Sequence, residues 1–152
     1  MVEIERKFLI NTQLWNPTVK GIKISQGYLS IDSEKVIRVR IADEQGFLTI
    51  KGKAIGIVRT ELEYEIPKNE AVLLLKMCNG LMVEKYRYKE KFMDMIWEVD
   101  IFEGKNKGLF LAEIELEHEN QEFDLPDWVG EEVTFDKRYY NSWLSQNPFS
   151  SW

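Results

Sequence analysis

Polar and apolar residues alternate with a period of two along most of this chain. Successive side chains of a β-strand point to opposite faces, so this alternation predicts strands. Helical signals are few: one helix is predicted after Pro67, ending at Asn79-Gly80, and a second from Asp136 to Gln146. The predicted strands cover residues 2–9, 22–31, 35–43, 46–53, 57–66, 80–91, 94–103 and 109–117.

About eight antiparallel strands with few helices indicate a mainly β (α+β) fold. We expect a closed eight-stranded antiparallel β-barrel with a few flanking helices. A length of 152 residues is typical of one domain, so the barrel is expected to span residues 1–152.

The polar face of these strands is almost entirely charged, and each strand carries mostly one sign. The opposite face is apolar, as at Ile37, Val39 and Ile41. The acidic positions are Glu3, Glu5, Glu61, Glu63, Glu65, Glu98, Asp100, Glu113, Glu115 and Glu117. The basic positions are Arg38, Arg40, Lys51, Lys53, Lys85 and Arg87.

Two arrangements of this charged face are compatible with the alternation. In the first, the apolar faces fill an ordinary barrel and the charges lie in water, which the pattern alone favours. In the second, the charges line a wet tunnel and the apolar faces are covered from outside by the helices and long connections. The segregation by sign favours the tunnel, because carboxylates bind Mg²⁺ or Mn²⁺ and basic groups bind phosphate oxygens.

Composition narrows the function classes further. A net charge of −6 argues against a general nucleic-acid binder. Cys78 is the single cysteine, which excludes an internal disulfide and a zinc ribbon. We expect Cys78 in the core and the single histidine, His118, on the surface. No apolar run is long enough to span a membrane, and MVEIERKF has charge where a signal peptide is apolar, so a cytoplasmic protein is expected. A homodimer is the default expectation.

The motif Glu3-Ile4-Glu5-Arg6-Lys7 resembles the E-x-E-x-K signature of the CYTH superfamily, the triphosphate tunnel metalloenzymes. The chain looks like the short, single-domain bacterial members. Further blocks follow in the order of that superfamily and extend the resemblance over residues 3–139. They are QGYL at 26–29, Arg38-x-Arg40, Thr49-Ile50-Lys51, Arg59-x-Glu61-x-Glu63, Glu84-Lys85-x-Arg87-Tyr88, Glu98-x-Asp100, Glu113-x-Glu115 and residues 132–139.

The resemblance implies a tunnel that acts on a triphosphate with Mg²⁺ or Mn²⁺. It places five carboxylates around the metal: Glu3, Glu5, Asp100, Glu113 and Glu115. It places eight basic groups on the phosphates: Lys7, Arg38, Arg40, Lys51, Arg59, Lys85, Arg87 and Lys137. Glu61 and Glu63 would line the acidic wall.

The residues expected to act in catalysis are Lys85, Glu5 and Asp100. The group that takes the proton from water is left open between a carboxylate of the acidic wall and Lys85. The leading expectation is a metal-dependent hydrolase that cleaves the terminal phosphoanhydride of inorganic tripolyphosphate. Alternatives are a thiamine triphosphatase, a nucleoside triphosphatase or an adenylate cyclase with the same site. A polyphosphate- or nucleotide-binding module without turnover is an alternative of another class.

Overall fold

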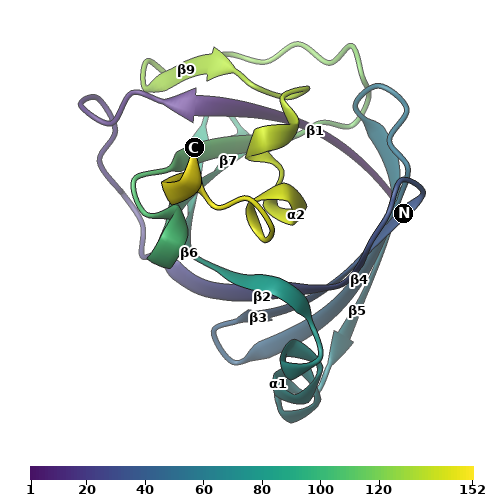
Figure 1. Ribbon diagram of the computed structural model, residues 1–152. Helices are drawn as coiled ribbons and strands as arrows, with labels where there is room; N and C mark the ends of the chain where they lie inside the picture. Colours follow the sequence, from purple (N-terminus) through teal and green to yellow (C-terminus); the bar gives the residue numbers. More distant parts are fainter.

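The computed structural model describes residues 1–152 and contains one antiparallel sheet whose first eight strands close into a barrel (Figure 1). Neighbouring strands follow the order β5-β4-β3-β2-β6-β7-β8-β1, and the pairing of β1 with β5 closes the ring. The strands are β1 (Val2–Ile10), β2 (Ile22–Ile31), β3 (Lys35–Ala42), β4 (Gln45–Gly52), β5 (Val58–Ile66), β6 (Asn79–Phe92), β7 (Met95–Phe102) and β8 (Phe110–Glu115).

All eight predicted strands are therefore confirmed, each within two residues at either end. A ninth strand, β9 (Val129–Glu132), was not predicted and pairs with the C-terminal part of β1, on the edge opposite β8. Its sequence, VGEE, has only four residues and no alternation, so the period of two cannot reveal it.

The charged face of the strands points into the barrel, as the second arrangement predicted. The apolar outer face of β1, β7 and β8 is covered by the connections that follow β1 and β8. Trp97 on β7 contacts Phe123 and Trp128 of the second connection edge to face, at ring-centroid distances of 5.8 and 5.9 Å. Trp15 of the first connection belongs to the same apolar cluster. The main core therefore lies outside the ring of strands and leaves its interior free for polar groups.

Helix α1 (Lys68–Lys76) packs on the outer side of β2, β3 and β4, and confirms the first predicted helix (Figure 1). Pro67 directly precedes it, where a missing N–H costs nothing. The fully buried Ala71 contacts β4 at Gly46, where an added Cβ would lie 2.8 Å from the Ala71 methyl group. The glycine thus allows the helix to approach the strand closely.

One end of the barrel is filled by side chains. On β1, β6, β7 and β8 the inward positions are charged along part of the strand and apolar toward this end. The C-terminal segment inserts Leu144, which is fully buried, into the apolar part. The resulting cluster consists of Val83, Phe102, Leu109, Leu111, Val133 and Leu144.

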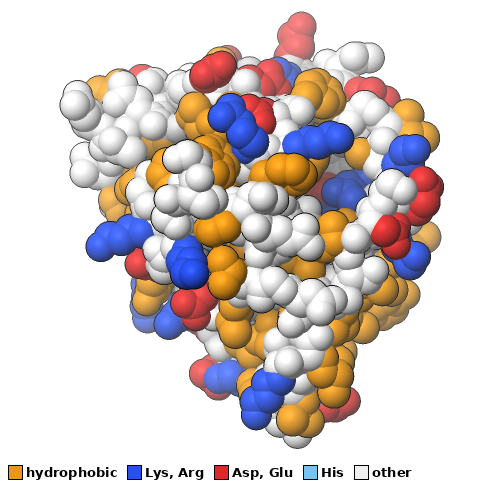
Figure 2. Space-filling model, viewed as in Figure 1, with side chains coloured by type: hydrophobic (Ala, Val, Ile, Leu, Met, Phe, Trp, Pro, Cys, Tyr) orange, Lys and Arg blue, Asp and Glu red, His pale blue; other side chains and the backbone are white.

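The second predicted helix is shorter than expected and lies elsewhere. Instead of one helix from Asp136 to Gln146, the chain forms the 3-10 turn η2 (Lys137–Tyr139) and the short helix α2 (Asn141–Leu144), separated by the extended Tyr140. Figure 1 shows α2 across the opening of the ring rather than on its outer surface. In Figure 2, uncharged atoms cover the centre of this face and charged side chains gather mainly around its edge. The barrel is therefore closed at this end and has the shape of a cup.

Two further 3-10 turns complete the chain: η1 (Gly104–Asn106) and η3 (Phe149–Ser151). The backbone N–H of Phe149 donates to Oδ1 of the buried Asn106, which ties the C-terminus to the β7–β8 connection. None of the helices combines the length and the hydropathy that a membrane-spanning helix needs. The homodimer stays a prediction.

Candidate active site

The interior of the barrel holds a cavity of about 600 Å³. This volume is typical of a small-molecule site. Thirteen of the fifteen residues predicted for the site line it, which brings together side chains from β1, β3, β4, β5, β6 and β8. They are Glu3, Glu5, Lys7, Arg38, Arg40, Lys51, Arg59, Glu61, Glu63, Lys85, Arg87, Glu113 and Glu115. Asp100 and Lys137 do not line the cavity.

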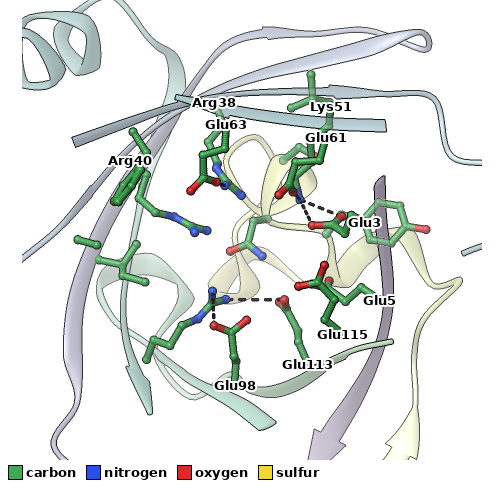
Figure 3. Close-up of a pocket in the computed structure, with 18 of the residues that line it drawn as sticks. Glu3, Glu5, Arg38, Arg40, Lys51, Glu61, Glu63, Glu98, Glu113 and Glu115 are labelled. Atoms are coloured by element: carbon green, nitrogen blue, oxygen red, sulfur yellow. Dashed lines mark hydrogen bonds and ion pairs between the residues drawn. The ribbon is translucent and has the colours of Figure 1, made fainter. Parts of the chain in front are cut away.

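Carboxylates crowd the wall formed by β1 and β8. Glu5 is paired in register with Glu115, and both side chains lie on the same wall in Figure 3. Lys7 is paired in register with Glu113. Neither Glu5 nor Glu115 forms an ion pair with a basic side chain. Burial, with repulsion from Glu113 and Glu3, raises the pKa of Glu5 well above its ordinary value. Burial and repulsion from Glu3 also raise the pKa of Glu115. The carboxyl groups in this part of the wall therefore outnumber the basic side chains that could neutralise them.

Next to it, Lys51 joins two carboxylates. Its ammonium lies 2.8 Å from Glu3 Oε2 and 3.2 Å from Glu61 Oε2, while Glu3 and Glu61 also share a hydrogen bond. Burial, with the hydrogen bond and charge of Glu3, raises the pKa of Glu61 to about 7. Burial acts to raise the pKa of Glu3, but Lys51 outweighs it and the pKa is lowered. Near neutral pH this pair therefore shares a proton.

The acidic wall fits a hard divalent cation. Mg²⁺ and Mn²⁺ prefer carboxylate oxygens, and the wall supplies two carboxyl groups, Glu5 and Glu115, that pair with no basic side chain. No three acidic side chains converge on one point in the geometry of a bound ion. The raised pKa values of Glu5 and Glu61 favour protons on these carboxyl groups, and a bound cation would displace them.

Arginines occupy the opposite side of the cavity. Arg38 donates to the hydroxyl of the buried Thr49 at 3.2 Å and lies 3.5 Å from Glu63. Arg40 forms no ion pair, and Figure 3 shows its guanidinium pointing into the open centre. Burial, with repulsion from Arg38 and Arg87, lowers the pKa of Arg40. This side of the cavity attracts an anion.

Asp100 lies beneath the cavity with both carboxylate oxygens occupied. Arg87 donates from Nε to Oδ1 at 2.8 Å and from Nη2 to Oδ2 at 2.9 Å. Lys85 donates from Nζ to Oδ2 at 2.7 Å, and both of these side chains are fully buried. Asp100 is thus absent from the cavity lining, and its role as a metal ligand stays a prediction.

Lys85 sits at the base of the cavity between Asp100 and Asn141, whose Oδ1 accepts from Nζ at 3.1 Å. Burial is the strongest influence on this lysine. Together with repulsion from Arg87 and Arg40, it outweighs the attraction of Asp100 and lowers the pKa of Lys85 to about 7. Lys85 can therefore take up or release a proton near neutral pH.

The two remaining lysines differ in position. Lys7 is buried, lies 3.5 Å from Glu113 Oε1 and donates to the backbone oxygen of Tyr139. Lys137 is exposed in η2, and its side chain does not reach the cavity. The C-terminal segment instead lines the cavity with Tyr140, Asn141 and Ser142. Binding of phosphate by Lys137 stays a prediction.

Sequence reasoning missed several polar residues of the site. Gln26 and Tyr28 of β2 belong to the noted QGYL block, and both are buried beside the arginines. Thr49, within the Thr49-Ile50-Lys51 block, is fully buried against Arg38. For Thr49 the available signal was its spacing of two from Lys51, which puts both side chains on one face of β4. For Gln26 and Tyr28 the signal was the QGYL block itself.

Three comparisons with known proteins agree with this geometry. The model of the CYTH domain family matches residues 1–146. The chain belongs to the CYTH family. This CYTH protein is 47% identical over 150 residues to an inorganic triphosphatase of Acetivibrio thermocellus, covering 98% of this chain and 96% of that protein. An inorganic triphosphatase of Nitrosomonas europaea is 38% identical over 149 residues, covering 95% and 97%.

A solved structure of the inorganic triphosphatase NE1496 superimposes on the CYTH protein with a TM-score of 0.68. That match covers 94% of this chain and 93% of the other at 37% identity. The similarity extends over the whole barrel, so the cavity lies in the part that these proteins share.

Proposed function

We propose that this CYTH protein is a metal-dependent hydrolase that removes the terminal phosphate of inorganic tripolyphosphate. One observation carries the proposal: the same cavity holds two carboxyl groups that pair with no basic side chain, Glu5 and Glu115, and a guanidinium that pairs with no carboxylate, Arg40. A triphosphate with its metal ion satisfies both groups at once. The names of the two curated relatives support this choice of substrate.

The basic groups position the phosphate chain. Arg38, Arg40 and Arg87 present guanidinium groups, which match phosphate oxygens in a bidentate geometry. Arg87 is held in place by Asp100, so it is ready to bind before the substrate arrives. We assign Asp100 a positioning role for Arg87 and Lys85. The filled end of the cup, lined by Asn141, limits how far the chain can enter.

The acidic wall would hold Mg²⁺ or Mn²⁺ through Glu3, Glu5 and Glu115, with Glu61 next to them. When bound, such an ion neutralises phosphate charge and polarises the terminal phosphoryl group. Glu113 has a different role. Although burial opposes it, Lys7 and Arg87 hold the pKa of Glu113 well below its ordinary value, so this carboxylate stays ionised and orients both basic groups.

We assign Lys85 as the group that accepts the proton from the attacking water. An attacking water forms a bond from its oxygen to the terminal phosphorus, while the bridging P–O bond breaks and its electron pair leaves with the diphosphate. The proton from water passes to Nζ of Lys85, which is neutral in about half of the molecules near pH 7 given its pKa of about 7. Glu5 is the competing acceptor, and the pH–rate profiles of Lys85→Met and Glu5→Gln decide between them.

A substrate panel tests the proposal. Phosphate release is measured from tripolyphosphate, ATP and thiamine triphosphate, each with Mg²⁺, with Mn²⁺ and with EDTA. We expect the highest kcat/KM with tripolyphosphate, none with EDTA, and loss of activity in Glu5→Gln but not in Glu70→Gln on the outer helix α1. A higher kcat/KM with an organic triphosphate, or cyclic AMP as the main product from ATP, overturns the substrate assignment. Binding of tripolyphosphate without turnover indicates a binding module.

A further inference from the structure

Gln26 connects two groups of the cavity from a fully buried position on β2. Its Oε1 accepts from Nε of Arg40 at 2.9 Å, and its Nε2 donates to the hydroxyl of Tyr28 at 3.0 Å. Arg40 is its direct neighbour in the β2–β3 pairing. Both polar ends of this amide are therefore used inside the site.

The orientation of the amide follows from its partners. The Nε–H of an arginine can only donate, so the oxygen of Gln26 must face Arg40. The NH₂ group of Gln26 then faces Tyr28, whose oxygen accepts and whose hydroxyl proton remains free. One side chain thus fixes the hydrogen-bonding direction of both neighbours.

Gln26 is neutral, whereas most basic groups of the cavity pair with a carboxylate; Arg59, which donates to the backbone oxygen of Gly52, also lacks one. Arg87 is paired with Asp100, Lys51 with Glu3, Lys7 with Glu113 and Arg38 with Glu63. Arg40 has no such carboxylate, so its positive charge is not compensated within the protein. An amide holds the guanidinium in place without reducing its attraction for an anion.

We propose that Gln26 is a positioning residue that aims the Arg40 guanidinium at the phosphate chain while leaving its full charge available. This inference rests on the proposed triphosphatase function and adds one residue to it. A carboxylate at this position would hold Arg40 equally well but neutralise it. An apolar side chain would leave Arg40 charged but free to turn away from the substrate.

Two variants separate these effects: Gln26→Glu, which is nearly isosteric, and Gln26→Met, which keeps the volume. For both we expect KM for tripolyphosphate to rise about tenfold or more, with a smaller change in kcat. Titration with tripolyphosphate in EDTA should show the same loss of affinity. Gln121→Glu is the matched control, because it makes the same chemical change on the connection after β8. Unchanged KM and affinity in both Gln26 variants would overturn the inference.

A double-mutant cycle tests whether Gln26 acts through Arg40. If it does, adding Gln26→Met to Arg40→Met causes no further loss of affinity beyond that of Arg40→Met alone. If the two losses multiply, Gln26 acts independently of Arg40 and the inference is wrong. Thermal unfolding of each variant confirms that the affinities are measured on folded protein.

The two proposals fail in different ways. A wild-type protein that does not hydrolyse tripolyphosphate overturns the proposed function. A wild-type protein that does so, while both Gln26 variants keep its KM and its affinity for tripolyphosphate, overturns only the role of Gln26.

Discussion

Lys85 and Asp100 form an ion pair at the base of the cavity, with 2.7 Å between Nζ and Oδ2 and no solvent exposure of either side chain. Arg87 shares the same carboxylate. A single aspartate thus pairs with two basic groups at the base of the cavity. Buried ions are costly without a partner, so this carboxylate fixes both the position and the charge of the base of the cup.

The first prediction concerns that aspartate. Asp100→Asn leaves two buried basic groups without their shared counterion, which we expect to cost about 4 kcal/mol of unfolding free energy. Thermal unfolding should show a Tm roughly 10 °C lower. Glu34→Gln, which breaks the exposed pair with Lys53, is the control and should leave the Tm almost unchanged. Equal effects of the two substitutions would contradict the role assigned to Asp100.

The second prediction is that Glu5→Gln stabilises the metal-free protein while it impairs metal binding. The pKa of Glu5 is raised in the folded state, so that state binds the proton more tightly than the unfolded chain. The stability from this group is present at low pH and is lost as pH rises from its ordinary value toward the raised pKa. The Tm of the variant in EDTA should therefore exceed that of wild type at pH 8, with a smaller difference at pH 5.

The same variant separates stability from function. Mn²⁺ should raise the Tm of the wild type, because a ligand that binds only the folded state stabilises it. Glu5→Gln should show a much smaller shift at the same concentration. A full Mn²⁺-induced shift in Glu5→Gln would remove this residue from the metal site.

Much of this site could be predicted from the sequence, because odd- and even-numbered residues of a strand point to opposite faces of the sheet. Glu3, Glu5 and Lys7 alternate, so all three had to share one face. This odd–even pattern does not show how far along the barrel axis a side chain lies. Asp100 has the same parity as Glu98, yet it lies beneath the cavity, because Arg87 and Lys85 bind it there. The position of a side chain along the barrel axis depends on which segments of different strands face each other, and the alternation within one strand does not reveal this.

The C-terminal segment shows a second limit. Tyr140, Trp143 and Leu144 share one face of a helical pattern, yet only Leu144 is fully buried and Trp143 is 42% exposed. The helix is interrupted at Tyr140, whose backbone is extended, because the chain must cross the end of the barrel. Contacts such as Lys7 with the backbone of Tyr139 override the local helical preference.

The third prediction is that metal affinity rises with pH. Glu61 has a pKa of about 7 and shares a proton with Glu3, so a cation must displace that proton below about pH 7. Titration of the substrate-free protein with Mn²⁺ should show tighter binding at pH 8 than at pH 6. Glu61→Gln should weaken this dependence, whereas Glu131→Gln on β9 should retain it. A pH-independent affinity in the wild type would contradict the shared proton.

The fourth prediction tests the filled end of the cup. Leu144→Ala removes a fully buried side chain from the apolar cluster inside the barrel, which we expect to cost about 3 kcal/mol. Because Leu144 anchors α2, the loss should also loosen Asn141, which accepts a hydrogen bond from Lys85. Activity should therefore fall even at temperatures where the variant is fully folded. Leu73→Ala, on the outer surface of α1 and 54% exposed, should change neither the Tm nor kcat appreciably. If Leu144→Ala lowered the Tm but left kcat unchanged, the end of the cup would be a structural seal that does not position Lys85.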